Sequence, residues 1–223
     1  IDNRTANARF GDEVTVSGHA HVDGTAVDGA RVRVRVGGVS LGAATTGSDG
    51  GFQVAADLPA SVASGNRTIE AVIVPPERAV RSETATTSLR VESTETALSV
   101  EATRDGDSQV RITGQLATAD GASVPGQTVE LRINGTTVAT VETGSSGSFA
   151  RLVSLESPQS GTITVRAVYD ARSSNLAGST AETVVDLDDR RGENGDDDGN
   201  RNESSFALNP FGGGGENEEN GLG

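Results

Sequence analysis

The chain of 223 residues contains no cysteine, methionine, tryptophan or lysine, and its aromatic side chains are one tyrosine and five phenylalanines. Because cysteine is missing, the chain cannot form a disulfide, a thiolate nucleophile or a cysteine-ligated zinc or iron–sulfur site. Valine, alanine, leucine and isoleucine are left to build any hydrophobic core. We expect no metal ion and no other cofactor.

Positive charge is also scarce, because 18 basic residues, all arginine, face 32 acidic residues and the formal net charge is -14. Such a chain repels phosphate backbones and anionic lipid, which argues against nucleic acid or a membrane surface as a partner. No apolar run approaches the roughly 20 residues that a membrane-spanning helix needs, so we expect no membrane insertion within this chain. It begins at Ile1 rather than methionine, and we expect it to be part of a longer polypeptide.

Residues 188–223 differ in composition from the rest of the chain. They are rich in aspartate, glutamate, asparagine and glycine, and they carry a net charge of -7, which is half of the total. A segment of this composition buries too little apolar surface to fold on its own. The sequence therefore predicts a disordered, acidic and glycine-rich linker or tail over 188–223.

An internal repeat with an offset of 96 to 97 residues runs through most of the remaining chain. Residues 14–18 (VTVSG) match 110–114 (VRITG), and the alternating valines of 32–36 match the apolar positions of 129–133. A glycine-rich turn followed by phenylalanine also recurs, as TGSDGGF and then as TGSSGSF. A repeat of this length indicates two copies of one small domain.

Within each copy, apolar and polar residues alternate in short runs bounded by turn residues, which is typical of half-buried strands. In the second copy we expect seven strands, around residues 98–102, 110–116, 129–133, 138–141, 149–155, 163–169 and 183–187. No run has helical periodicity. The sequence predicts an all-β fold of two tandem immunoglobulin-like (Ig-like) β-sandwiches of about seven strands each, over 1–92 and 93–187. The first strand of the first copy, with Ala6, Ala8 and Phe10 facing inward, is short, and the connection 92–96 is expected to be semi-rigid.

The repeated motifs resemble those of a known group of domains. Val-Thr-Val-Ser-Gly, Thr-Gly-Ser-x-Gly-x-Phe and the later Thr-x-x-Ala-Val-Tyr run of the second copy are similar to the tandem Ig-like repeats, of bacterial Ig-like or carboxypeptidase-regulatory-like type, of haloarchaeal cell-surface proteins. The first copy matches less closely, since it has no tyrosine in that run. The lysine-free, acidic composition is likewise similar to that of proteins from salt-loving archaea. The resemblance implies a fold and an extracellular or cell-surface location, but its motifs are turn and core residues and carry over no site.

Three arginines form the most conspicuous candidate binding feature. Arg31, Arg33 and Arg35 alternate with valines, so their side chains are expected on one outward face of a strand. Two interpretations stay open. The charges pair with acidic neighbours across the sheet, or they form a face for an anionic partner, such as cell-envelope glycans or surface proteins.

Other candidate residues are fewer and more ambiguous. Four Asn-x-Ser/Thr sequons predict N-glycosylation, at Asn3, Asn66, Asn134 and Asn202. His19 and His21 share the outward face of a strand and lack a third ligand, so we expect no metal site and no Ser-His-Asp catalytic set. The Asp105–Asp107 turn and the Asp196–Asp198 run offer oxygen ligands to a hard cation, but neither matches an EF-hand loop.

These observations predict a non-catalytic extracellular spacer or binding segment of a halophilic cell-surface protein. One alternative is an accessory ectodomain of a larger membrane-anchored protein of the transglutaminase-like kind. Another is a stand-alone adhesin or carbohydrate-binding module.

Overall fold

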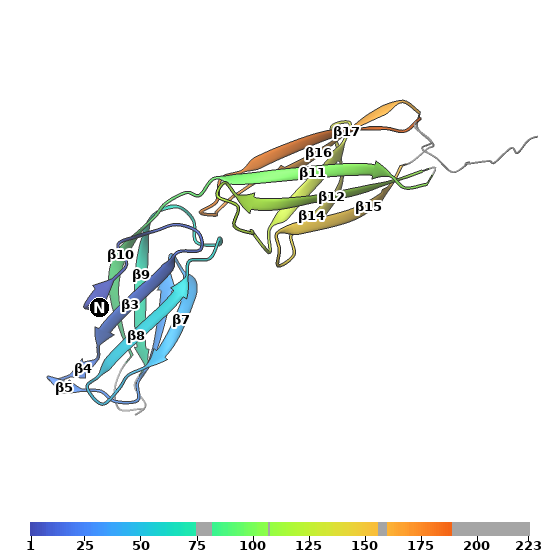
Figure 1. Ribbon diagram of the computed structural model, residues 1–223. Coiled ribbons are helices and arrows are strands. Elements are labelled where there is room, and N and C mark those ends of the chain that lie inside the picture. Colours follow the sequence, from blue (N-terminus) through green and yellow to red (C-terminus); the bar gives the residue numbers. More distant parts are fainter. Residues whose placement is uncertain (75–81, 107, 156–159, 189–223) are drawn as a thin grey trace, which may run out of the picture. The chain divides into compact units, whose positions relative to one another are not determined.

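The computed structural model describes residues 1–74, 82–106, 108–155 and 160–188 (Figure 1). All regular structure in these ranges is β-strand, arranged in two β-rich halves, β1–β10 and β11–β17, each with its own core. Within them no helix occurs that is long and apolar enough to cross a membrane. The predicted all-β fold is confirmed. The domain boundaries at 92 and 187 stay predictions, and the predicted tail, apart from Asp188, lies outside the described residues.

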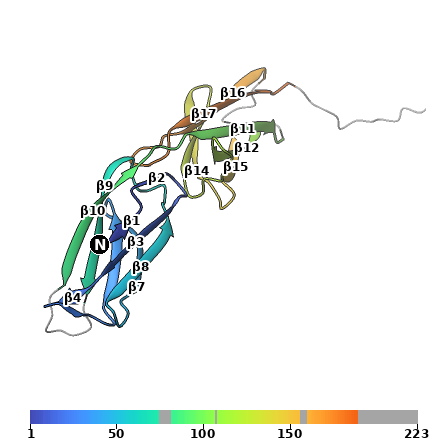
Figure 2. The same cartoon turned by 60° about the vertical axis from the view of Figure 1, so that its left-hand side comes forward.

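The first half consists of two main sheets and a small hairpin (Figure 2). One sheet has the strand order β1-β3-β8, the other has the order β2-β10-β9-β6-β7, and the hairpin pairs β4 with β5. The strands are β1 (Asn3–Arg4), β2 (Asn7–Ala8), β3 (Glu13–His19), β4 (His21–Val22), β5 (Thr25–Ala26), β6 (Arg31–Val36), β7 (Val39–Thr45), β8 (Gly51–Asp57), β9 (Gly65–Val74) and β10 (Glu83–Val91).

The second half is a simpler version of the same arrangement, with sheets β11-β12-β15 and β14-β13-β16-β17. Its strands are β11 (Thr96–Arg104), β12 (Gln109–Thr118), β13 (Thr128–Ile133), β14 (Thr136–Glu142), β15 (Ser148–Ser154), β16 (Thr162–Tyr169) and β17 (Ser179–Asp186). They coincide with the seven predicted strands, and every pairing between them is antiparallel. Two antiparallel sheets of this order form an Ig-like sandwich.

Side-chain alternation decides which face of each sheet is buried. In β6 the valines Val32, Val34 and Val36 are 0% exposed, whereas the residues between them are exposed. In β13, Val129 and Leu131 are buried in the same phase. Because successive side chains of a strand point to opposite faces, these two strands each give an aliphatic stripe to the core and a polar stripe to the surface.

The repeated Thr-Gly-Ser-x-Gly-x-Phe motif is explained by a buried threonine. Thr46 Oγ1 donates a hydrogen bond to the Val27 carbonyl (2.6 Å) and accepts one from the Ala30 amide (2.9 Å). Thr143 makes the equivalent pair of bonds in the second half. Buried backbone groups need partners, and this hydroxyl supplies two of them where the chain enters β6 and β13.

The second glycine of the motif is required by its backbone conformation and by its neighbours. Gly50 and Gly147 have φ angles of +77° and +75°. A Cβ atom would lie 2.4 Å from the Ala20 carbonyl oxygen at position 50 and 2.3 Å from the Leu116 carbonyl oxygen at position 147. Only glycine fits this turn, which places Phe52 or Phe149 in the core two residues later, at the start of β8 or β15.

The first strand of the first half differs from its prediction, because it is split between the two sheets. β1 pairs antiparallel with β3, and β2 pairs parallel with β10. Ala8 is buried as expected, but Ala6 is exposed at the crossing point. A strand that changes sheets cannot keep one alternation throughout its length.

Residues 92–95, between the two halves, are hydrogen-bonded on both sides. The Glu92 amide donates to the Ala8 carbonyl (2.9 Å), and the Thr94 amide donates to the Asn175 carbonyl (2.7 Å). Thr94 Oγ1 also accepts a bond from the Phe10 amide (3.3 Å). The connection is therefore hydrogen-bonded to β2, to the loop between β2 and β3, and to the loop that precedes β17.

Asn175 extends this network to the loop that follows β8. Its side chain is 0% exposed, its Nδ2 donates to the Pro59 carbonyl (3.2 Å) and its amide donates to the Ala60 carbonyl (3.2 Å). Ala60 and Phe10 pack into the core cluster of the second half. Two residues of the first half thus contribute apolar surface to the second core.

Candidate functional site

The arginine stripe, defined as Arg31, Arg33 and Arg35, lies on the outer face of β6. All three side chains are exposed. β6 lies between β9 and β7 in the five-stranded sheet, so the stripe follows an inner strand rather than an edge. The structure brings the three residues together on one face, and their binding role stays a prediction.

The side chains beside the stripe are small or apolar, with one exception. The residues in register with the three arginines are Thr45, Ala43 and Ser40 on β7, and Val74, Val72 and Glu70 on β9. In the part of the chain that the structure describes, no carboxylate oxygen lies within 4.0 Å of a stripe guanidinium. Even Glu70, beside Arg35, forms no ion pair. The first interpretation was that the arginines pair with acidic side chains on neighbouring strands. Among the described residues no such ion pair is formed.

The second half carries a different set of residues at the equivalent positions. Thr128, Glu130 and Arg132 alternate on β13, and Arg132 Nε donates to Glu130 Oε1 at 2.8 Å. This hydrogen bond lowers the pKa of the Glu130 carboxyl and raises the pKa of Arg132. The outer face of β13 is therefore neutralised within itself, whereas the outer face of β6 is not.

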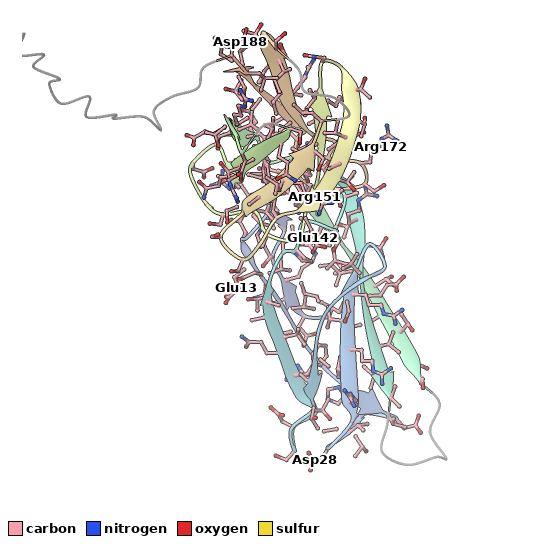
Figure 3. All side chains as sticks on the ribbon, turned by 90° about the vertical axis from the view of Figure 1, so that its right-hand side faces the viewer. Glu13, Asp28, Glu142, Arg151, Arg172 and Asp188 are labelled. Atoms are coloured by element: carbon pink, nitrogen blue, oxygen red, sulfur yellow. The ribbon has the colours of Figure 1, made fainter. Side chains whose placement is uncertain are left out.

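A second difference between the halves lies on the edge strands β8 and β15. Val54 on β8 is 4% exposed and lies so close to β7 that a Cβ atom on Gly42 would be 2.9 Å from it. The equivalent residue of β15 is Arg151, which is exposed although it occupies the inward phase between Phe149 and Val153 (Figure 3). An inward-phase charge on an edge strand opposes pairing with another chain.

A surface pocket of about 420 Å³ lies beside the β4–β5 hairpin. Its lining residues are His19, Ala20, His21, Val22, Asp23, Val27, Ile73, Glu83, Thr84 and Ala85. The two histidine rings are 6.0 Å apart. No group of three or more histidine, aspartate or glutamate residues able to hold a metal ion occurs within the described ranges. Val22 continues the alternation of the buried residues Val14, Val16 and Ala20, but it is 39% exposed because β3 ends at His19 and the chain turns into the hairpin.

His19 has a structural partner near the start of the chain. Its Nδ1 lies 2.6 Å from Asp2 Oδ2, and this hydrogen bond lowers the pKa of the Asp2 carboxyl. The Asp2 amide also donates to the Ser17 carbonyl at 2.9 Å. These two hydrogen bonds hold the first residues of the chain beside β3.

The predicted glycosylation sequons lie in different settings. Asn3 and Asn66 are exposed on β1 and β9. Asn134 is exposed in the β13–β14 turn with a φ of +48°, and its Oδ1 accepts a hydrogen bond from the Thr164 amide at 3.0 Å. Asn202 lies outside the described residues. The Asn134 side chain is thus hydrogen-bonded to β16 while the residue itself is exposed.

Of the acidic candidates for cation binding, Asp105 lies among the described residues. Asp105 Oδ2 accepts a hydrogen bond from Arg111 Nη2 at 2.7 Å, so an arginine already neutralises this carboxylate. Asp107 and the Asp196–Asp198 run lie outside the described residues.

Sequence reasoning missed the residues whose roles depend on distant parts of the chain. Asn175 follows two serines and has the local signature of a loop, so no neighbouring residue signals its burial between the halves. Ile73 and Glu83 line the pocket from β9 and β10, far from the two histidines in sequence. Only the spacing of Glu130 and Arg132, two apart on one strand, was a signal that could have been read.

Comparison with known proteins agrees with the class that the topology defines, an Ig-like β-sandwich protein. Residues 2–89 match the model of the archaeal bacterial Ig-like domain family, and the first half of the chain is therefore a domain of this kind. No curated protein matches the chain.

Solved structures similar to the chain include three described as adhesins or adhesion proteins. They are a Ca²⁺-stabilised adhesin with which an Antarctic bacterium binds ice (19% identity, TM-score 0.31), the Yersinia pseudotuberculosis adhesin InvE (13%, 0.49) and a tetra-tandem repeat from the extending region of a large adhesion protein (20%, 0.40). The matches cover 81%, 81% and 78% of this chain, and 46%, 56% and 48% of those chains. The chain thus spans about half the length of these proteins.

Proposed function

We propose that this chain is a non-catalytic spacer or binding segment of an extracellular cell-surface protein. The observation that carries the proposal is the pairing of an archaeal bacterial Ig-like domain with a second sandwich through a hydrogen-bonded connection. Such a pair holds two modules in series and displays their polar outer faces. The exposed arginine stripe supports a binding role for one of these faces.

A surface location is tested on intact source cells. An antibody against the second half should label unpermeabilised cells, and brief protease treatment of those cells should remove the labelled band while a cytoplasmic marker protein survives. If the band persists until the cells are lysed, the proposed location is wrong.

The acidic, lysine-free composition supports a halophilic setting. Excess carboxylates repel one another, and salt screens this repulsion because the Debye length falls from about 10 Å at 0.1 M to about 3 Å at 1 M. We expect the thermal unfolding temperature to rise between dilute buffer and molar NaCl. An unfolding temperature that does not change over this range would remove the halophile inference.

N-glycosylation is part of the same proposal, with Asn3, Asn66 and Asn134 as its exposed sites among the described residues. Intact-mass and peptide analysis of the native polypeptide would show which sequons carry glycan and what segments precede or follow this chain. A membrane span and a transglutaminase-like domain beyond it would favour the accessory-ectodomain alternative. Saturable retention of the isolated chain on cell-envelope glycan would favour the adhesin or carbohydrate-binding alternative.

A further inference from the structure

The arginine stripe is an uncompensated row of positive charge on a chain whose net charge is -14. None of its three guanidinium groups has a carboxylate within 4.0 Å among the described residues. The equivalent row of the second half is neutralised by its own Glu130–Arg132 pair. The uncompensated row is therefore a property of this strand and not of the fold.

The surroundings of the stripe leave the guanidinium groups accessible. Five of the six residues in register with it are Ser, Thr, Ala or Val, and none of these five carries a charge. An inner strand also has no free backbone edge, since both sides of β6 are already paired. A partner must therefore be recognised through the arginine side chains.

The spacing of the stripe sets the spacing of the partner's charges. Alternate residues of a strand are about 6.6 to 6.8 Å apart, so the three arginines repeat at that distance along β6. An extended polypeptide with a carboxylate at every second residue has the same repeat. Each guanidinium can then bind one carboxylate through two parallel hydrogen bonds. In a polyuronic acid, by contrast, the charge spacing is set by the sugar ring and not by the strand rise.

We propose that the arginine stripe is a docking face for an extended acidic polypeptide segment whose carboxylates alternate along the chain. The proposal goes beyond the surface-spacer function and does not depend on it, because docking on this face is independent of where the protein resides. At molar salt the Debye length is about 3 Å, which is close to the distance between the charged groups of a direct ion pair. Salt therefore screens the long-range attraction between the partners before it weakens the direct ion pairs.

The test uses the full chain and two labelled peptides of identical composition. In one peptide aspartate alternates with threonine, and in the other aspartates and threonines follow one another in pairs. Fluorescence anisotropy at about 0.1 M salt should show tighter binding of the alternating peptide. The triple variant Arg31→Ser, Arg33→Ser, Arg35→Ser should bind it roughly 10- to 100-fold more weakly, as expected for the loss of three exposed charge pairs.

A second triple variant, Arg90→Ser, Arg151→Ser, Arg166→Ser, changes the net charge equally and removes exposed arginines outside the stripe. It should bind the alternating peptide as the wild type does. Thermal unfolding of both triple variants, and the milder variant Arg33→Lys, separates loss of binding from loss of fold. Equal affinity for the two peptides, equal weakening by the two triple variants, or tighter binding of polygalacturonate than of the alternating peptide would each overturn the proposal.

Discussion

Replacing Gly147 by alanine should destabilise the second half far more than a positive φ angle alone would. An alanine in this left-handed region costs about 1 kcal/mol. The new Cβ would also lie 2.3 Å from the Leu116 carbonyl oxygen, so the turn must move away from β12. That movement breaks the bond from the Leu116 amide to the Gly147 carbonyl (2.9 Å) and weakens the one from Val124 to the Leu116 carbonyl (3.2 Å). At about 1 kcal/mol for each bond, the total loss is about 3 kcal/mol.

Gly121→Ala is the matched control, because Gly121 also has a positive φ (+92°) but has no atom within 4 Å of the new Cβ position. With about 4 to 8 °C per kcal/mol for a domain of this size, the unfolding temperature should fall by roughly 12 to 24 °C for Gly147→Ala and by roughly 4 to 8 °C for the control. Tyr169 is the only tyrosine in a chain without tryptophan, so its fluorescence reports on the second half alone. Equal shifts for the two variants would refute the steric argument.

Two further predictions concern titration. The hydrogen bond from His19 lowers the pKa of the Asp2 carboxyl. The stability that this hydrogen bond contributes is therefore present above the ordinary pKa of 3.8 and is lost as the pH falls through the lowered pKa. In the variant His19→Ala, NMR titration should find the pKa of Asp2 moved back up toward 3.8. Burial raises the pKa of Tyr169, so stability from this group is complete below the ordinary value of 10.0 and declines as the pH rises through the raised pKa. When the pH is raised from neutral past 10.0, the free energy of unfolding should fall less in Tyr169→Phe than in the wild type. The same fall in both proteins would contradict this prediction.

The features that the sequence predicted well are those set by neighbours along the chain. Alternation in β6 and β13 follows from the two-residue period of a strand, and the Thr-Gly-Ser-x-Gly-x-Phe turn follows from a glycine conformation and a threonine hydroxyl, all within one short segment. Because the sequence repeats with an offset of 96 to 97 residues, a strand or turn predicted in one copy could also be predicted at the equivalent position of the other copy.

The features that it predicted poorly depend on partners that lie far away in sequence. Ala6 is exposed because the first strand leaves β3 to pair with β10, some eighty residues later. Asn175 is buried because it contacts the carbonyls of Pro59 and Ala60 in the other half. For the arginine stripe, alternation predicted the outward face, but only the register of β7 and β9 shows which side chains flank it.

Comparison of the two halves indicates where function resides. Positions that the fold requires are alike in both, such as Thr46 and Thr143, which make the same pair of hydrogen bonds. Positions on the outer faces are not fixed by the core, and there the halves differ, with the arginine stripe on β6 and the Glu130–Arg132 pair on β13. The edge strands differ as well, because Val54 of β8 is buried in the core and the equivalent Arg151 of β15 is exposed. Because the common scaffold cannot explain these differences, a role that distinguishes the first half from the second must lie on such surfaces. The β6 face, with three like charges and no ion pair within the described residues, is therefore the surface on which we propose that a partner of negative charge docks.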